Sequence, residues 1–150
     1  MVCRRRQRRG DSGAVAVEFA LVLPILLLLL FGIVQYGLYF WAAQGGASAT
    51  REAARRAAVG DMTSCAEFQS HVRDRIDALG SGAGTATVSR AYANGPGNTS
   101  SAVEVGDIVT VTVAFNSIDL RIPFLPFGDG QVTQTAESRV EHVPTAPATC

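Results

Sequence analysis

The sequence predicts an α+β protein in which a long N-terminal transmembrane α-helix extends outward and packs on a small antiparallel β-sheet. The 32 residues between Glu18 and Arg51 carry no formal charge, and this length exceeds the ~20 apolar residues that cross a ~30 Å hydrocarbon core. The segment 108–115 alternates apolar and polar residues, as a half-buried strand does. We therefore expect a basic leader at 1–13, a spanning and extended helix at 14–59, and a small α+β domain at 60–150.

The charges on either side of the apolar run differ in sign. Before Gly13 the chain carries five arginines and one aspartate, whereas from Asp61 onward it carries five arginines and ten acids. Positively charged flanks stay in the cytoplasm, so we expect a single-pass protein of the bacterial cytoplasmic membrane with an extracytoplasmic C-terminal domain. An arginine cluster also suits nucleic acid or anionic lipid, but the nearby span favours topology, and we expect no nucleic-acid partner. The arginines that set this orientation are Arg4, Arg5, Arg6, Arg8 and Arg9.

The predicted helix has features of both a membrane span and a packing element. Pro24 removes one backbone amide and should kink the helix, which membrane spans tolerate. Small residues and good helix formers continue the helix to a stop signal at Gly60 and Asp61, so about half of it should project beyond the membrane and allow close approach of another backbone. Aromatic side chains that suit a headgroup interface mark the expected outer boundary at Tyr36, Tyr39, Phe40 and Trp41.

The remainder of the chain shows one short helix and three candidate strands. Apolar residues spaced by four, four and three predict an amphipathic helix over 64–79: they are Phe68, Val72, Ile76 and Leu79. A weak period of two predicts a strand over 85–93, followed by a turn at 94–98. The clearest strand, 108–115, should bury Val109, Val111, Val113 and Phe115 and continue over 118–122, until Pro123 and Pro126 interrupt it. The final strand is expected within 131–142.

The three cysteines divide according to the predicted topology. Cys3 falls on the reducing cytoplasmic side, whereas Cys65 and Cys150 fall outside, where disulfides persist. A bridge between these two would close nearly the whole exported domain and stabilise it by roughly 4 to 5 kcal/mol on the chain-entropy model. We predict this disulfide; the alternative is a pair of free thiols.

No motif in the sequence indicates catalysis. Glu67 and His71 lack the second histidine that a zinc-binding helix requires, and His142 lies far away in the sequence. The glycines at 80, 82 and 84 suit a linker better than a phosphate-binding loop, and no serine or cysteine has the sequence context of an activated nucleophile. We therefore expect no enzymatic activity, no metal and no cofactor.

Glu18 is an unusual residue at the start of an apolar span. A charged residue costs roughly 2.5 to 3.5 kcal/mol at the centre of a membrane helix and less near the interface, so its carboxylate requires a partner. The residues alone leave two interpretations open. Glu18 either lies at headgroup level, paired with water or Arg9, or has a partner that serves a function.

Gly13, followed by four residues and then Glu18 and Phe19, resembles the prepilin-peptidase site of type IV pilins. The longer run AVEFALVLPILLLLLFGIVQYG, with TREAARRAAVGD after it, resembles the TadE-like family of tight-adherence (Flp-type) pilus proteins. The resemblance implies a minor pilin or pseudopilin whose partners are a prepilin peptidase, other pilin-like subunits and the tight adherence secretion machinery. It also implies cleavage between Gly13 and Ala14, which would make Glu18 the fifth residue of the mature chain. In pilin-like assemblies this acid pairs with the N-terminal amine of a neighbouring subunit.

Two other functions remain open at this point. The first is an exported protein with an ordinary signal peptide, cleaved after the small residues Ala47, Ser48 and Ala49, although the uncharged run far exceeds the usual 7 to 15 residues. The second is a single-pass adhesin or envelope scaffold whose helix serves only as an anchor.

Overall fold

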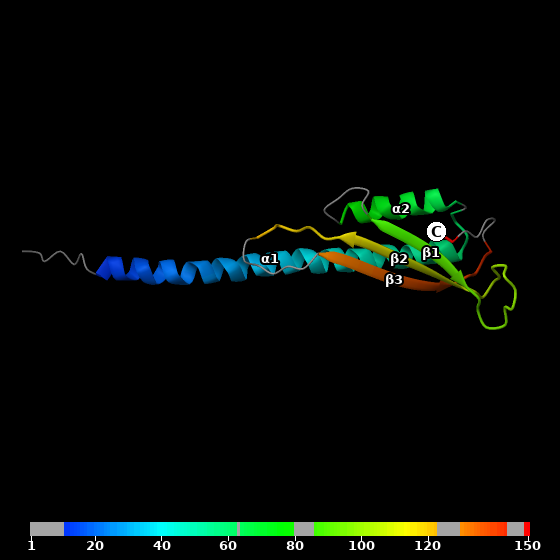
Figure 1. Ribbon diagram of the computed structural model, residues 1–150, viewed down its shortest axis with the longest axis horizontal. Helices are drawn as coiled ribbons and strands as arrows, with labels where there is room; N and C mark the ends of the chain where they lie inside the picture. Colours follow the sequence, from blue (N-terminus) through cyan, green and yellow to red (C-terminus); the bar gives the residue numbers. More distant parts are fainter. Residues whose placement is uncertain (1–10, 63, 80–85, 123–129, 144–148) are drawn as a thin grey trace, which may run out of the picture.

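The computed structural model describes residues 11–62, 64–79, 86–122, 130–143 and 149–150. It confirms the predicted α+β architecture, in which a long N-terminal helix packs on a small antiparallel sheet. Figure 1 shows that the helix extends far beyond the domain on one side. In chain order the elements are α1 (Asp11–Ala58), α2 (Cys65–Asp77), β1 (Thr87–Ala93), β2 (Ile108–Asn116) and β3 (Gln131–Arg139).

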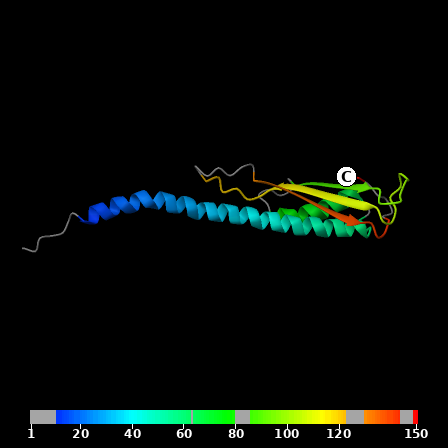
Figure 2. The same ribbon diagram turned by 90° about the horizontal axis from the view of Figure 1, so that it is seen from below.

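The domain has two layers. The three strands form an antiparallel sheet in the order β1-β2-β3, with Val111 of β2 opposite Arg90 of β1 and Ala136 of β3. The outer half of α1 packs against β2 and β3, and α2 packs beside α1 against β1. Figure 2 shows both helices on the same side of the sheet.

The core lies between these layers, and its sheet face is the one predicted from the alternation in β2. Val109, Val111, Val113 and Phe115 are all buried. The helices contribute side chains of two sizes to the same core. Large residues come from α2, namely Phe68, Val72 and Ile76, and small ones come from α1, namely Ala42, Ala53, Ala54, Ala57 and Ala58.

Small residues let α1 lie close to the sheet and to the residues that follow α2. A Cβ atom added to Gly46 would lie 2.7 Å from the ring of Phe115, and one added to Gly45 would lie 2.7 Å from Leu79. Real Cβ atoms do not approach other heavy atoms so closely, so the glycines permit this packing. The helix ends at Ala58, and Gly60 follows with a φ of 71°, a common way to end a helix.

One predicted strand segment was wrong. β2 ends at Asn116 and does not continue over 118–122, because Ile118 and Leu120 bond to a side chain of α1 where a neighbouring strand would be needed. β3 ends at Arg139 and lies within the segment 131–142, where the final strand was predicted. Pro24 lies inside α1 without interrupting it, and Figure 2 shows a shallow bend in the blue part of the helix. The predicted linker and the residues Pro123 and Pro126 lie outside the described residues.

Candidate membrane anchor and processing site

The inner half of α1 exposes its apolar side chains on every side. Residues 15–34 include Ile25, which is 63% exposed, and Ile33, which is 73% exposed, and none of the most apolar part of the helix is buried by the domain. Twenty helical residues extend about 30 Å, which matches the hydrocarbon thickness of a bilayer. By length and composition this half of α1 is a candidate membrane span.

The predicted processing residues lie at the start of this span. Gly13, Ala14, Glu18 and Phe19 all belong to the first turns of α1 and are all exposed. A Cβ atom on Gly13 would meet nothing within 4 Å. Within the described part of the chain, Glu18 has no ion pair or hydrogen bond to another side chain. The leader arginines, including Arg9, lie outside the described residues.

Gln35 marks the point where the domain begins to cover α1. Its side chain is only 1% exposed. Its Nε2 donates to the carbonyl oxygen of Ile118 at 2.9 Å, and its Oε1 accepts from the backbone N–H of Leu120 at 3.0 Å. A single side-chain amide therefore supplies one donor and one acceptor to a segment that has left the sheet, which satisfies backbone groups that would be costly to leave unpaired.

The aromatic residues follow Gln35 directly. Tyr36, Phe40 and Trp41 are 48%, 60% and 49% exposed, whereas Tyr39 is half-buried and packs at the edge of the core. They lie within the next two turns of the helix, beyond the exposed apolar half. Their position at a headgroup interface remains a prediction.

The C-terminal residue contacts the edge of the sheet. The structure joins Cys65 to Cys150 in a disulfide with a Cα–Cα distance of 5.8 Å. The backbone N–H of Cys150 donates to Arg90 O at 2.8 Å, and Arg90 N–H donates to Cys150 O at 3.3 Å. Two side chains of α2 bond the same edge of β1, because Gln69 donates to Val88 O and Arg73 donates to Ala86 O, each at 3.1 Å. This edge is thereby protected from pairing with another chain.

Arg90 and Asp107 are two buried polar residues that the sequence analysis did not identify. The guanidinium of Arg90 lies 4.7 Å from the centroid of the Phe68 ring and 5.7 Å from that of Tyr92, a cation–π arrangement. Burial raises the pKa of Tyr92. The sequence indicated that Arg90 is buried only through its position in the weak alternation of residues along β1.

Asp107 organises the turn between β1 and β2. Its carboxylate accepts hydrogen bonds of 2.8 Å from the backbone N–H groups of Gly95 and Glu104, and Asn98 also donates to it. These bonds favour the charged form and lower the pKa of Asp107. The turn at 94–98 was predicted, but the sequence did not indicate that the carboxylate of Asp107 stabilises it through hydrogen bonds.

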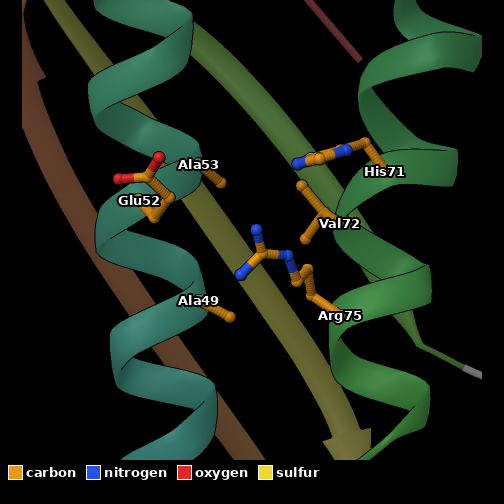
Figure 3. Close-up of a pocket in the computed structure, with 6 residues that line it drawn as sticks. All are labelled: Ala49, Glu52, Ala53, His71, Val72 and Arg75. Carbon is orange, nitrogen blue, oxygen red and sulfur yellow. The ribbon is translucent and has the colours of Figure 1, made fainter.

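The groove between α1 and α2 encloses a cavity of about 20 Å³, enough for one water molecule. Figure 3 shows His71 and Arg75 reaching from α2 toward α1, while the carboxylate of Glu52 points away from α2. Glu52 accepts hydrogen bonds from Arg55 at 3.1 Å and Arg56 at 2.8 Å, which lower its pKa to about 2. Among the described residues no three potential metal ligands lie together.

The comparison with protein families identifies the helix that carries these features. The family model described as TadE-like protein matches residues 13–55. The helix is TadE-like. Over these residues, the match confirms the resemblance that the sequence predicted. The TadE-like segment begins at Gly13, at the predicted cleavage site, and ends within the buried half of α1, so it includes both the candidate span and most of the packing half. Searches of the curated proteins and of the solved structures found no match to this chain.

Proposed function

We propose that this protein is a TadE-like minor pilin or pseudopilin that takes part in assembly of the tight adherence pilus. The observation that carries the proposal is the TadE-like match over 13–55, which coincides with a helix whose inner half is exposed and apolar over the thickness of a bilayer. The inner half anchors the protein in the cytoplasmic membrane, and the sheet domain presents the outer half to the assembly machinery.

The distribution of charge supports one orientation. Five arginines precede the span, and residues 61–150 carry ten acids and five arginines. The arginine end stays in the cytoplasm, and the domain is exported. The disulfide between Cys65 and Cys150 agrees with an oxidising exterior.

A prepilin peptidase cleaves the chain between Gly13 and Ala14. The new N-terminal amine of Ala14 has a reference pKa near ~8 and is largely protonated at neutral pH. Glu18 has no partner among the described residues of its own chain, so its carboxylate is available to the amine of a neighbouring subunit. This pairing would offset the free-energy cost of a carboxylate in an apolar span.

Intact-mass spectrometry tests the processing step. The full chain is co-expressed with a prepilin peptidase, extracted from membranes and measured. The expected mass corresponds to an N-terminus at Ala14, and Gly13→Val should block cleavage while the matched control Gly10→Val should not. A chain that retains Met1 under these conditions would contradict the processing claim.

The packing of α1 argues against an ordinary signal peptide. Cleavage after Ala49 would remove Gln35 and Ala42, which are 1% and 0% exposed, together with the Gly46 contact to Phe115. The domain would lose part of its core and the hydrogen bonds to 118–120. Recovery of a folded domain from the medium with Thr50 at its N-terminus would nevertheless favour that function.

A second experiment separates a pilus subunit from a scaffold that is merely anchored. Glu18→Ala should reduce surface pili without releasing the protein from the membrane, because the apolar span is intact. Glu67→Ala, an exposed acid on α2, is the matched control and should leave piliation unchanged. Normal piliation in the Glu18→Ala strain would support the scaffold.

A further inference from the structure

The segment 117–122, which we name the base loop, extends from the end of β2 back along α1 toward the membrane end of the molecule. Figures 1 and 2 both show it, in yellow to orange, beyond the sheet and beside the helix. Two sets of hydrogen bonds attach its first residues to the rest of the domain. Ser117 donates its backbone N–H and its hydroxyl to Gly130 O, each at 2.9 Å, and Ile118 and Leu120 bond to Gln35.

The attachment point fixes the depth of the base loop relative to the exposed apolar half of α1. Gln35 is the first residue after the segment 15–34, whose length matches the hydrocarbon core. The backbone of Ile118 and Leu120 therefore meets the helix at the level where headgroups begin. This argument rests on the proposed membrane anchoring of α1.

The surface of the base loop suits that level. Leu120 is 44% exposed although it is apolar, and Arg121 beside it is exposed with a φ of 49°. A residue with a Cβ atom rarely adopts this backbone conformation, which is held here by a 2.8 Å hydrogen bond from Arg121 N–H to Asp119 Oδ1. An apolar side chain next to a long cationic one is typical of a membrane interface.

The adjoining turns of α1 present a matching surface. Tyr36, Phe40 and Trp41 are each about half exposed or more and lie within two turns of Gln35. Aromatic side chains prefer the same interfacial layer. The base loop and these aromatic side chains therefore lie at the same level along α1.

We propose that the base loop lies in the headgroup layer of the outer leaflet, with Leu120 at the acyl-chain boundary and Arg121 at the lipid phosphates. The partner of this surface is the lipid bilayer. The domain is then seated on the membrane at a fixed depth, held by two contacts, the helix and the loop.

Depth-dependent fluorescence quenching tests this proposal. Trp41 is the only tryptophan in the chain, so Trp41→Phe provides a silent background in which Leu120→Trp reports on the base loop. The full chain is reconstituted in vesicles of three parts phosphatidylethanolamine to one part phosphatidylglycerol, with lipids brominated near the glycerol end of the acyl chains. Val105→Trp is the matched control, because Val105 is an apolar residue with 67% exposure in the β1–β2 connection at the opposite end of the domain.

The expected result is that these lipids quench Leu120→Trp much more strongly than Val105→Trp, because an interfacial side chain lies at the boundary between headgroups and acyl chains. Equal quenching at the two positions would overturn the proposal. A third variant, Leu28→Trp, reports on the span itself. If lipids brominated deep in the bilayer quench Leu28→Trp and no lipid quenches Leu120→Trp, the base-loop proposal fails alone; if Leu28→Trp is also unquenched, the membrane anchoring fails with it.

Discussion

The two halves of α1 belong to one continuous helix but are built for different surroundings. The inner half, 15–34, is dominated by large apolar side chains that the domain leaves exposed. The outer half, 35–58, has small residues on the side that faces the sheet, and its buried positions include Ala42, Ala53 and Ala57. Neither half carries a formal charge between Glu18 and Arg51.

The difference shows that side-chain size, more than the absence of charge, separates the two halves. Alanine and glycine let a sheet approach the helix axis, and the Cβ distance at Gly46 shows how close that approach is. Leucine, isoleucine and phenylalanine in the inner half present an apolar surface far larger than a soluble monomer normally exposes. The inner half therefore requires lipid or another subunit around it.

The largest expected effect comes from placing charges in the inner half. Ile25→Arg combined with Leu26→Arg should raise the apparent free energy of membrane insertion by roughly 5 to 7 kcal/mol, since each arginine near the centre of a span costs ~2.5 to 3.5 kcal/mol. We expect most of the protein to become extractable from membranes by alkaline carbonate. The measurement is the carbonate-resistant fraction on immunoblots.

The matched control places two arginines on the exposed surface of the outer half, at Gln44 and Ser48. This variant should remain as resistant to carbonate as the parent chain. If both double variants are released equally, then the two halves do not differ in their surroundings.

The next largest effect is expected on removal of the disulfide in the domain that packs on the outer half. The disulfide spans a sequence separation of 85 residues, so Cys65→Ser combined with Cys150→Ser should lower the free energy of unfolding by about 2 to 5 kcal/mol. Thermal unfolding of the full chain in detergent micelles, followed by near-ultraviolet circular dichroism, measures the loss. Cys3→Ser is the control and should not shift the midpoint, and an unchanged midpoint in the double variant would contradict the stabilising role of the bridge.

Local patterns in the sequence predicted the elements of the fold well. The charge-free run located the candidate span, and the spacing of Phe68, Val72 and Ile76 identified the buried face of α2. The alternation in 108–115 identified the buried face of β2. Each of these signals depends on residues within a few positions of one another, where the period of the element dictates which side chains share a face.

Interactions between distant parts of the chain were not predictable in the same way. Gln35 and Ile118 are 83 positions apart. The segment 118–122 was predicted to continue the strand, because nothing nearby in the sequence shows that a side-chain amide, and not a neighbouring strand, bonds its backbone. Arg90 was likewise unassigned because its aromatic contact, Phe68, lies on another element. The processing residues were found by resemblance to a family, and the structure adds that they are exposed on α1.

Gln35 lies at the junction of the two halves, and its removal tests where the outer half begins. Gln35→Leu leaves Ile118 C=O and Leu120 N–H without their partner, which should cost about 1 to 3 kcal/mol. We expect faster hydrogen exchange at the Leu120 amide and a lower thermal midpoint. Gln44→Leu is the matched control, because Gln44 is an exposed amide on the same helix, and it should leave both quantities unchanged. Equal effects from the two variants would show that the Gln35 amide is not what attaches the base loop.

The smallest effect is expected at the glycines, and it tests the role of side-chain size directly. In Gly46→Ala the new methyl group would lie 2.7 Å from the Phe115 ring, and overpacking of this kind costs about 1 to 3 kcal/mol. Alanine recovers up to ~1 kcal/mol through its higher helix propensity, so the net loss of unfolding free energy should be ~0 to 2 kcal/mol. In Gly37→Ala the methyl group meets nothing within 4 Å, so only the gain in helix propensity remains. The two thermal midpoints should therefore move in opposite directions, and a shift of the same sign and size in both would mean that α1 does not approach the sheet as closely as its glycines permit.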